Sequence, residues 1–313
     1  MNVRVIPRLD IKGPNLVKGI HFEGLRVLGK PEWFARHYYE HGADELIYMD
    51  AVASLYGRNS LTDIVERTSK EIFIPLAVGG GLRSVDDIRT VLRAGADKVS
   101  LNTAAIRRPE LIREASRAFG SSTILVSIEA IRKPDGSYEA YVDYGRQATG
   151  VDAVEWAKRA VELGAGELAV TSIDREGTGK GYDVELTRQI AEAVPVPVIA
   201  GGGAGRVEHV AEVVSAGRAD AVSMASLLHY NFVRTVDISR GDFSVEGNVE
   251  FMSGRRGDVA NRRIADASLG EIKDHLAARG IGCRDVGTGG APAPAPAGSA
   301  REAAGPPGAR HDE

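Results

Sequence analysis

The chain has 313 residues, of which 43% are hydrophobic and 26% charged, with a formal net charge of −4 and a pI near 6.0. This length suits one large domain, and the slightly acidic charge gives no basis for binding nucleic acid or an anionic membrane. A single cysteine, Cys283, excludes an intramolecular disulfide and argues against a cysteine-rich metal site. We therefore expect neither a metal nor a cofactor.

The chain also lacks the patterns of a membrane or secreted protein. No apolar run approaches the ~20 residues needed to span a bilayer. The N-terminal residues lead straight into a strand without a signal-peptide pattern. A cytoplasmic location is the expectation that follows.

Strands and helices alternate along most of the sequence. The expected strands are residues 4–9, 45–50, 123–128 and 167–172, with two more in each of the segments 74–104 and 196–226. The expected helices are residues 30–41, 61–70, 109–119, 154–163, 184–193 and 269–278, with one more in each of the same two segments. A polar stretch at 132–144 is expected to form a hairpin around Pro134-Asp135-Gly136.

The segments 74–104 and 196–226 are copies of one pattern. Each runs from a short apolar stretch through three glycines into an amphipathic helix and a second apolar stretch, which predicts strand, turn, helix and strand. In the first copy Ser84 is the expected N-cap. Eight such βα units, the last four resembling the first four, predict a (β/α)₈ TIM barrel built from two repeated half-barrels.

The two glycine runs, 79–81 and 201–203, predict phosphate sites. Glycines between a strand and a helix let backbone N–H groups approach a phosphate, and the helix N-terminus adds positive potential. The alternative is that each run is only a tight turn. Repetition favours the phosphate interpretation, because small polar residues follow each run one unit later: Asn102 and Thr103 in one half, Ser226 in the other. Two such turns suit a substrate with two phosphate ends.

Five stretches carry a resemblance to a known family. They read PRLDIKGPNLVKG, DELIYMDAVAS, GADKVSLNTAA, GAGELAVTSIDREGTGKGYD and PVIAGGGAG. In this order and spacing they closely resemble the cyclase subunit of imidazole glycerol phosphate synthase, the ammonia-using enzyme of histidine biosynthesis, over roughly residues 3–233 and again in the last helix.

The resemblance implies a specific reaction. A bisphosphate, phosphoribulosyl-formimino-AICAR ribonucleotide, would react with ammonia from a separate glutaminase subunit. The products would be imidazole glycerol phosphate and AICAR ribonucleotide. Neither a nucleic acid nor a membrane is implied as a partner.

Two carboxylates are the expected catalytic residues. Asp10 and Glu129 end strands one and five, which are opposite each other in an eight-stranded barrel, at the end where barrel enzymes place their reactive groups. One can protonate a leaving or carbonyl oxygen while the other removes a proton from the incoming nitrogen. The alternative is a pair of ion-paired acids at strand ends.

Further polar residues and glycines at the same end are candidate substrate or phosphate ligands. They are Lys18, Asp50, Gly80, Gly81, Asn102, Thr103, Thr171, Ser172, Asp174, Gly202, Gly203 and Ser226. A solvated lysine and turn-satisfying polar groups are the alternatives for several of them.

The opposite end of the barrel collects charged strand starts. Arg4, Glu45, Lys98 and Glu167 begin strands one, two, four and six. A stabilising salt-bridge ring is the ordinary explanation. In the resembled family this ring gates the ammonia passage from the docked glutaminase, and Asp97 would belong to the docking surface.

The sequence departs from the family at several positions. Family members carry aspartate at Glu129, cysteine at Arg8, serine at Gly201 and aspartate at Glu176, and the loop after Asp10 differs. An added methylene moves a carboxylate by more than an ångström, which can cost ~10²-fold in rate.

These departures leave alternatives open. One is a divergent paralogue that uses glutaminase-derived ammonia on another phosphorylated or nucleotide-sugar substrate. Another is a catalytically impaired binding subunit. A sugar-phosphate isomerase of the sister barrel is disfavoured, because it would need neither ring nor glutaminase.

The domain organisation expected is a single barrel domain over residues 1–286. A polar, Arg- and Gly-rich insertion interrupts it at about 235–266. Residues 287–313 are rich in Pro, Ala and Gly and are expected to be a disordered tail.

Overall fold

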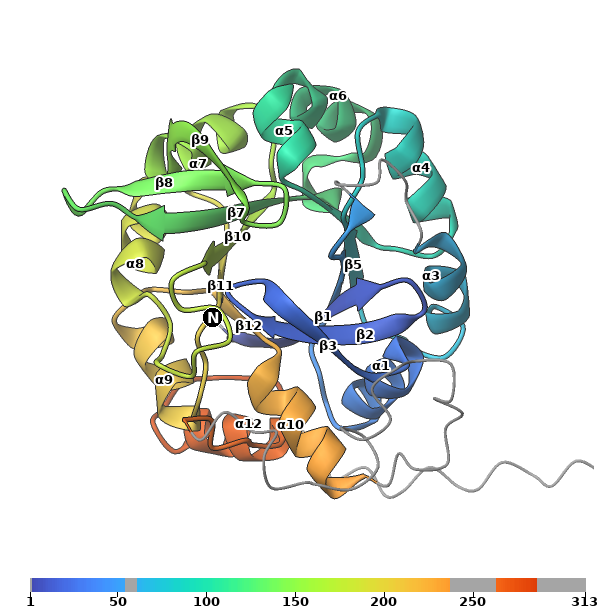
Figure 1. Ribbon diagram of the computed structural model, residues 1–313, viewed down its shortest axis with the longest axis vertical. Helices are drawn as coiled ribbons and strands as arrows, with labels where there is room; N and C mark the ends of the chain where they lie inside the picture. Colours follow the sequence, from blue (N-terminus) through green and yellow to red (C-terminus); the bar gives the residue numbers. More distant parts are fainter. Residues whose placement is uncertain (1, 54–60, 237–262, 286–313) are drawn as a thin grey trace, which may run out of the picture.

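The computed structural model describes residues 2–53, 61–236 and 263–285. Figure 1 looks along a closed barrel of parallel strands surrounded by helices. The barrel strands are β1 (Arg4–Lys12), β4 (Leu46–Asp50), β5 (Leu76–Gly79), β6 (Lys98–Leu101), β7 (Ile124–Arg132), β10 (Glu167–Ser172), β11 (Val198–Gly201) and β12 (Ala221–Met224). The barrel closes where β12 pairs with β1, with Ala221 opposite Arg4. The predicted (β/α)₈ fold is confirmed.

The helices between the strands cover the outside of the barrel. They are α1 (Pro31–Glu40), α3 (Thr62–Thr68), α4 (Val85–Arg93), α6 (Glu110–Phe119), α7 (Ala153–Glu162), α8 (Val184–Ala193), α9 (Val207–Ser215) and α12 (Leu269–Ala277). Ser84 is the N-cap of α4, as predicted, and forms a capping box with Asp87. The buried residues of these helices, such as Ile88 and Val91 of α4, join the main hydrophobic core against the strands.

Side chains alternate between that outer core and the barrel interior. The interior holds a separate apolar layer made of Ile6, Ile47, Met49, Ala77, Leu125, Ala169, Ile199 and Ala221. Each of these residues is at most 8% exposed, so the barrel is filled rather than hollow. Polar side chains lie above and below this layer.

The first strand of each half-barrel continues past the barrel into an antiparallel hairpin. β1 pairs with β2 (Asn15–Ile20), which pairs with β3 (Glu23–Gly29). β7 pairs with β8 (Tyr138–Val142), which pairs with β9 (Gln147–Asp152). The second hairpin contains the predicted turn, whereas the first was not predicted.

The hairpin residues form a small hydrophobic cluster of their own. We call it the roof cluster, and its buried members are Val17, Phe22, Ala51, Tyr144 and Ile173. The cluster gathers residues that follow β1, β4, β7 and β10, so it lies at the carboxyl ends of the barrel strands. This end, the mouth, is where the candidate site lies.

Two helices that were not predicted begin directly after barrel strands. α5 (Thr103–Arg107) follows β6, and α10 (Ser226–Thr235) follows β12. The residues expected to end strands four and eight therefore start helices. A short 3₁₀ turn, η1 (Ser121–Thr123), precedes β7.

The predicted insertion and tail fall mostly outside the described residues. Residues 237–262 of the insertion and all of 287–313 are among those not described. At the far end of the insertion, Ile264 is buried and Ala265 N donates to Gly205 O over 2.8 Å. This end of the insertion is therefore anchored on the barrel next to α9.

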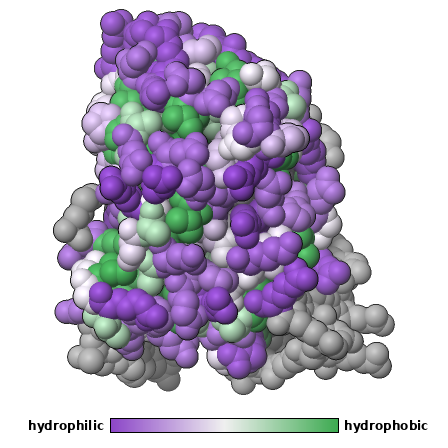
Figure 2. All heavy atoms as spheres, turned by 90° about the vertical axis from the view of Figure 1, so that its left-hand side faces the viewer, coloured by the Kyte–Doolittle hydropathy of each residue, from purple (hydrophilic) through white to green (hydrophobic). Residues whose placement is uncertain are grey.

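One side of the molecule is shown in Figure 2. Its surface is mostly hydrophilic, with hydrophobic side chains scattered rather than gathered into one patch. Among the described segments, every helix is too short or too polar to cross a membrane.

Candidate active site

Three charged side chains meet in the mouth. Asp10 and Glu129 are each 2% exposed, and Arg8 contacts both. Arg8 Nε donates to Asp10 Oδ1 over 3.0 Å, and Arg8 Nη1 donates to Thr171 Oγ1 over 3.3 Å. Arg8 Nη2 lies 3.9 Å from Glu129 Oε1. The structure thus brings the two predicted carboxylates together, with an arginine that was not predicted to be part of the site.

The environment gives these groups different protonation behaviour. Burial raises the pKa of Glu129 to about 7, and the nearby charge of Arg8 opposes that rise. Burial acts to lower the pKa of Arg8, but attraction by Asp10, Tyr144, Glu129 and Glu176 together more than compensates, so the pKa lies above its ordinary value and the guanidinium stays charged. A buried carboxyl with a pKa near 7 suits proton transfer at neutral pH.

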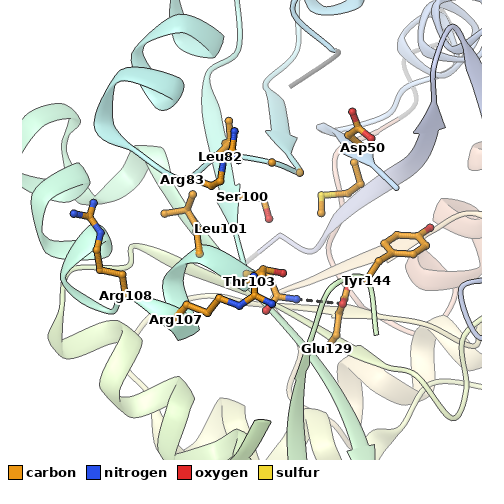
Figure 3. A pocket seen from close by; sticks show the side chains of 15 residues that line it. Asp50, Leu82, Arg83, Ser100, Leu101, Thr103, Arg107, Arg108, Glu129 and Tyr144 are labelled. Carbon is orange, nitrogen blue, oxygen red and sulfur yellow. Dashed lines mark hydrogen bonds between the residues drawn. The ribbon is translucent and has the colours of Figure 1, made fainter. Parts of the chain in front are cut away.

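The first glycine turn opens onto a cavity of about 260 Å³. Its lining includes Gly80, Gly81, Asn102 and Thr103, and it extends to Glu129. Figure 3 shows Glu129 in this cavity, joined to Asn102 by the hydrogen bond drawn as a dashed line, in which Asn102 Nδ2 donates to Glu129 Oε2 over 3.1 Å. The predicted phosphate ligands of this half are therefore continuous with a catalytic candidate.

Glycine is required at this turn. Gly80 has φ +100°, and a Cβ there would lie 2.7 Å from the carbonyl oxygen of Asp50. Asp50 lines the same cavity, and its Oδ1 accepts from Val52 N over 3.0 Å. Asp50 is thus at the mouth as predicted, although part of its carboxylate serves the turn.

The second glycine turn faces a much smaller space. Its cavity is about 20 Å³ and is lined by Gly202, Gly203 and Ser226 together with Arg8 and Glu176. The predicted ligands of this half are brought together, but Arg8 occupies one side of their pocket. The two glycine turns have similar backbones, but the second turn leaves much less empty space beside it than the first.

The predicted ligand Lys18 is committed to an ion pair. Its Nζ hydrogen-bonds Glu176, and both side chains are buried. Burial acts to lower the pKa of Lys18, but Glu176 and then Asp10 raise it, so the lysine stays charged. Glu176 is one of the positions that depart from the family, and its carboxylate reaches this lysine across the mouth.

Two candidates lie outside the cluster of Arg8, Asp10 and Glu129. Asp174 Oδ2 accepts from Arg132 N over 2.9 Å and lines an outer cleft beside α8. Ser172 lies next to Thr171 on β10, and because Thr171 faces Arg8 in the interior, Ser172 faces the opposite side. Its Oγ is buried with no hydrogen-bond partner among the described residues.

The four charged strand starts form a closed ring at the other end of the barrel. Arg4 Nη1 donates to Glu45 over 2.7 Å, and Arg4 also hydrogen-bonds Glu167. Lys98 Nζ donates to Glu45 over 3.0 Å and to Glu167 over 2.8 Å. Each cation therefore bridges both carboxylates, and the predicted ring exists.

Asp97 has a structural role beside the ring. Its Oδ2 accepts from Leu76 N over 2.9 Å, where β5 begins. Asp44 and Asp220 do the same for Val5 N and Val198 N. The Asp of each Ala-Asp pair that precedes a strand thus fixes the start of a neighbouring strand. This structural role explains the presence of Asp97 without a partner protein.

Tyr144 is a further mouth residue that sequence reasoning missed. It lines the larger cavity opposite Arg107 and Arg108 (Figure 3) and packs on Phe22. Arg107 is tied to Asp143 over 2.6 Å. No local signal marked Tyr144, because it lies in the turn after a hairpin strand. Arg8 did carry a signal, since it is two residues from Asp10 and therefore on the same face of the strand.

We predict that inorganic phosphate occupies the first turn at lower concentration than the second, because only the first has room for it in this state. Crystals soaked in rising phosphate should show density at Gly81, Asn102 and Thr103 before density at Gly203 and Ser226. Thr103→Val should weaken the first site by roughly tenfold, the cost of about one charge-assisted hydrogen bond. Both turns empty at high phosphate would count against a bisphosphate substrate.

In the described part of the chain, His, Cys, Asp and Glu side chains nowhere gather in a group of three that could hold a metal ion.

Comparison with known proteins identifies relatives that match most of this chain. A family model described as histidine biosynthesis protein matches residues 4–234. Imidazole glycerol phosphate synthase subunit HisF of Legionella pneumophila is 58% identical over 207 residues, which is 66% of this chain and 98% of that protein. The HisF subunit of Methanopyrus kandleri is 44% identical over 299 residues, which is 90% of this chain and 97% of that protein.

A third relative agrees with these two. The HisF subunit of Alkaliphilus metalliredigens is 48% identical over 230 residues, covering 74% of this chain and 91% of that protein. The family expected from the sequence motifs is confirmed. This chain belongs to the histidine biosynthesis protein family, among the HisF subunits of imidazole glycerol phosphate synthase.

Proposed function

We propose that this chain is the ammonia-dependent cyclase subunit of imidazole glycerol phosphate synthase, with its active site in the mouth of the barrel. Ammonia and phosphoribulosyl-formimino-AICAR ribonucleotide are converted to imidazole glycerol phosphate and AICAR ribonucleotide. The observation that carries the proposal is the buried pair Asp10 and Glu129, which Arg8 contacts on both sides. Glu129 lines the cavity at the first glycine turn, and Arg8 lines the cavity at the second. The names of the relatives support it.

The charges in the mouth support different roles for the two carboxylates. Among the ion-paired side chains around Asp10, Arg8 and Lys18 are cations, while Asp10, Glu129 and Glu176 are carboxyl groups, which leaves this group with one negative charge in excess when all are ionised. A buried site disfavours that excess, and Glu129, with a pKa of about 7, is the group that keeps a proton. Glu129 is therefore the general acid and Asp10 the general base.

The opposite end of the barrel supports a separate source of ammonia. In our proposal ammonia enters at the ring and passes between the packed side chains of the apolar interior layer, because a neutral molecule enters such a layer at far lower desolvation cost than ammonium. A glutaminase subunit docks at this end in our proposal. Phe73, in the loop that leads to β5, is 78% exposed and packs its ring edge-on against Tyr39, which gives a partner an apolar contact.

The direct test is turnover with ammonium and no glutaminase. The purified chain should convert the bisphosphate ribonucleotide at about pH 8, where free ammonia and protonated Glu129 are both present. Chromatography should detect both products in equal amounts. If the ribonucleotide binds normally but is not consumed, the result would instead favour another phosphorylated or nucleotide-sugar substrate.

A second prediction concerns the ring. Lys98→Met removes one of two bridging cations, so glutamine-dependent turnover with a glutaminase subunit should fall by roughly fivefold or more, the size of a coupling near 1 kcal/mol. Ammonium-dependent turnover should change by less than about twofold, because the ring is remote from the mouth. Lys158→Met, which removes an exposed lysine paired with Glu155, is the matched control. Equal losses with both nitrogen sources would show damage to the barrel instead.

A further inference from the structure

Arg8 lies between the proposed acid, Glu129, and the proposed base, Asp10, but has no role of its own in that mechanism. It is 8% exposed, and its position is fixed from two directions. Asp10 and Thr171 hold the guanidinium, and His229 holds the backbone, because His229 Nε2 donates to Arg8 O over 3.0 Å. Burial lowers the pKa of His229 to about 3, so the ring is neutral. Such support is typical of a group held ready for a ligand.

The roof cluster shields this guanidinium from water. The Phe22 ring centroid lies 5.3 Å from Arg8 Cζ, and Tyr144 packs on Phe22 with ring centroids 4.4 Å apart. Phe22 and Tyr144 have φ of 62° and 59°, in the left-handed region that such residues rarely adopt. Backbone strain of this kind concentrates at functional sites. Exclusion of water makes the charge of Arg8 act more strongly on anything bound beside it.

One nitrogen of Arg8 still has an N–H to donate. Nη2 is buried without a hydrogen-bond partner among the described residues. At 3.9 Å it is too far from Glu129 Oε1 to bond directly. Two groups at this separation can both reach one oxygen about 2.8 Å from each. The 3.9 Å separation therefore suits a single acceptor atom that would receive a hydrogen bond from Arg8 and a proton from Glu129. Because Nη2 is buried in this structure, a bound substrate has to displace the side chains that cover it.

We propose that Arg8 is a catalytic residue of this chain, which with Glu129 binds the oxygen of the substrate carbonyl that ammonia attacks. The inference rests on the proposed function. A nitrogen–carbon bond forms, and the π electrons of the carbonyl move to its oxygen, which is held by Arg8 Nη2. Glu129 gives a proton to that oxygen, and Asp10 takes one from the added nitrogen. The step yields a neutral carbinolamine, which loses water afterwards.

The test is the kinetics of Arg8→Met with ammonium as the nitrogen source. Loss of one preorganised donor to a developing oxyanion should lower kcat by about 10²- to 10³-fold with a much smaller change in KM. Arg8→Lys keeps the charge but not the planar fork and should fall between Arg8→Met and the wild type. Arg113→Met, which removes an exposed arginine paired with Glu110, is the matched control and should match the wild type.

The pH profile separates catalysis from a merely structural role. Since Arg8 opposes the raised pKa of Glu129, its removal should raise that pKa further. The alkaline limb of kcat, where Glu129 loses its proton, should then move to higher pH in Arg8→Met and stay in place in Arg113→Met. A variant that is only misfolded would lose amplitude without moving the limb.

The outcomes separate the two proposals. A wild-type chain that turns over nothing with ammonium overturns the proposed function and the Arg8 assignment together. An active wild type with Arg8→Met within threefold of it and an unmoved limb overturns the Arg8 assignment alone. Thermal melting checks folding. If Arg8→Met is unfolded at the assay temperature, Arg8→Lys decides, because a tenfold loss supports the assignment and full activity overturns it.

Discussion

Asp10→Asn should reduce ammonium-dependent turnover by at least about 10³-fold while substrate affinity stays within several-fold of the wild type. The amide keeps the shape of the side chain and removes its ability to accept a proton, which is the contribution general base catalysis makes. Arg8 Nε can still donate to the amide oxygen in the place of Oδ1, so the mouth should keep its geometry. The loss should therefore appear in kcat.

The measurement needs single-turnover kinetics with ammonium beside a binding titration. Asp86→Asn changes an exposed carboxylate at the start of α4 and serves as the matched control, with activity expected within twofold. Thermal melting checks whether loss of the buried ion pair with Arg8 has unfolded Asp10→Asn. Full activity in Asp10→Asn would remove the acid–base mechanism and leave Asp10 as a partner that only positions Arg8.

Local patterns were sufficient to predict the barrel. The repeated glycine unit specifies strand, turn and helix within about 30 residues, and short connections leave few ways to arrange eight such units. The predicted N-cap at Ser84 and the hairpin around residues 134–136 followed from the same local chemistry. These features depend on neighbours in sequence, so sequence reasoning could find them.

The first hairpin depends on contacts that sequence spacing does not reveal. Its turn is His21-Phe22, with φ of 51° and 62°, where Gly or Asn would be the usual signal. A distant segment holds it, because His21 N donates to Glu176 O over 3.0 Å and His21 Nδ1 to Ile173 O over 2.6 Å. Tertiary packing therefore overrides a weak local preference.

The candidate site, like the fold, could be predicted only where local patterns determine the position of a residue. Asp10 and Glu129 could be placed because strand ends in a barrel share one mouth. The pairing of Lys18 with Glu176 joins positions 158 residues apart and has no signature in either segment. The partner of Asp174 could not be predicted for a related reason, since only the path of the loop after β10 decides that its carboxylate accepts from Arg132 N.

Glu129→Gln should change the pH dependence of stability. Burial raises the pKa of Glu129 from 4.5 to about 7, so the folded state holds its proton more tightly than the unfolded state. This contribution is fully present below about pH 4.5 and is lost as pH rises through about 7, a change of up to about 3 kcal/mol. Urea unfolding between pH 4.5 and 8 should show this loss in the wild type and not in Glu129→Gln.

The kinetics of Glu129→Gln should also show whether Glu129 donates a proton or only positions other groups. Glu129→Gln keeps the length of the side chain but has no proton to give, so kcat should fall by about 10²- to 10³-fold and lose its alkaline limb near pH 7. A wild-type limb far above pH 7, or Glu129→Gln with normal turnover, would exclude Glu129 as the acid.

Glu129→Asp tests whether the longer side chain is fitted to this mouth. The shorter chain withdraws the carboxyl by more than an ångström from Asn102 Nδ2, now 3.1 Å away, and from Arg8 Nη2, now 3.9 Å away. We expect about a tenfold or larger loss of kcat, because misplacement on that scale is costly. Recovery of activity in the double variant Arg8→Cys, Glu129→Asp, with low activity in each single variant, would show that the two positions changed together. Higher activity in Glu129→Asp alone would instead mean that the mouth is built for the shorter acid and that Arg8 tolerates the longer one.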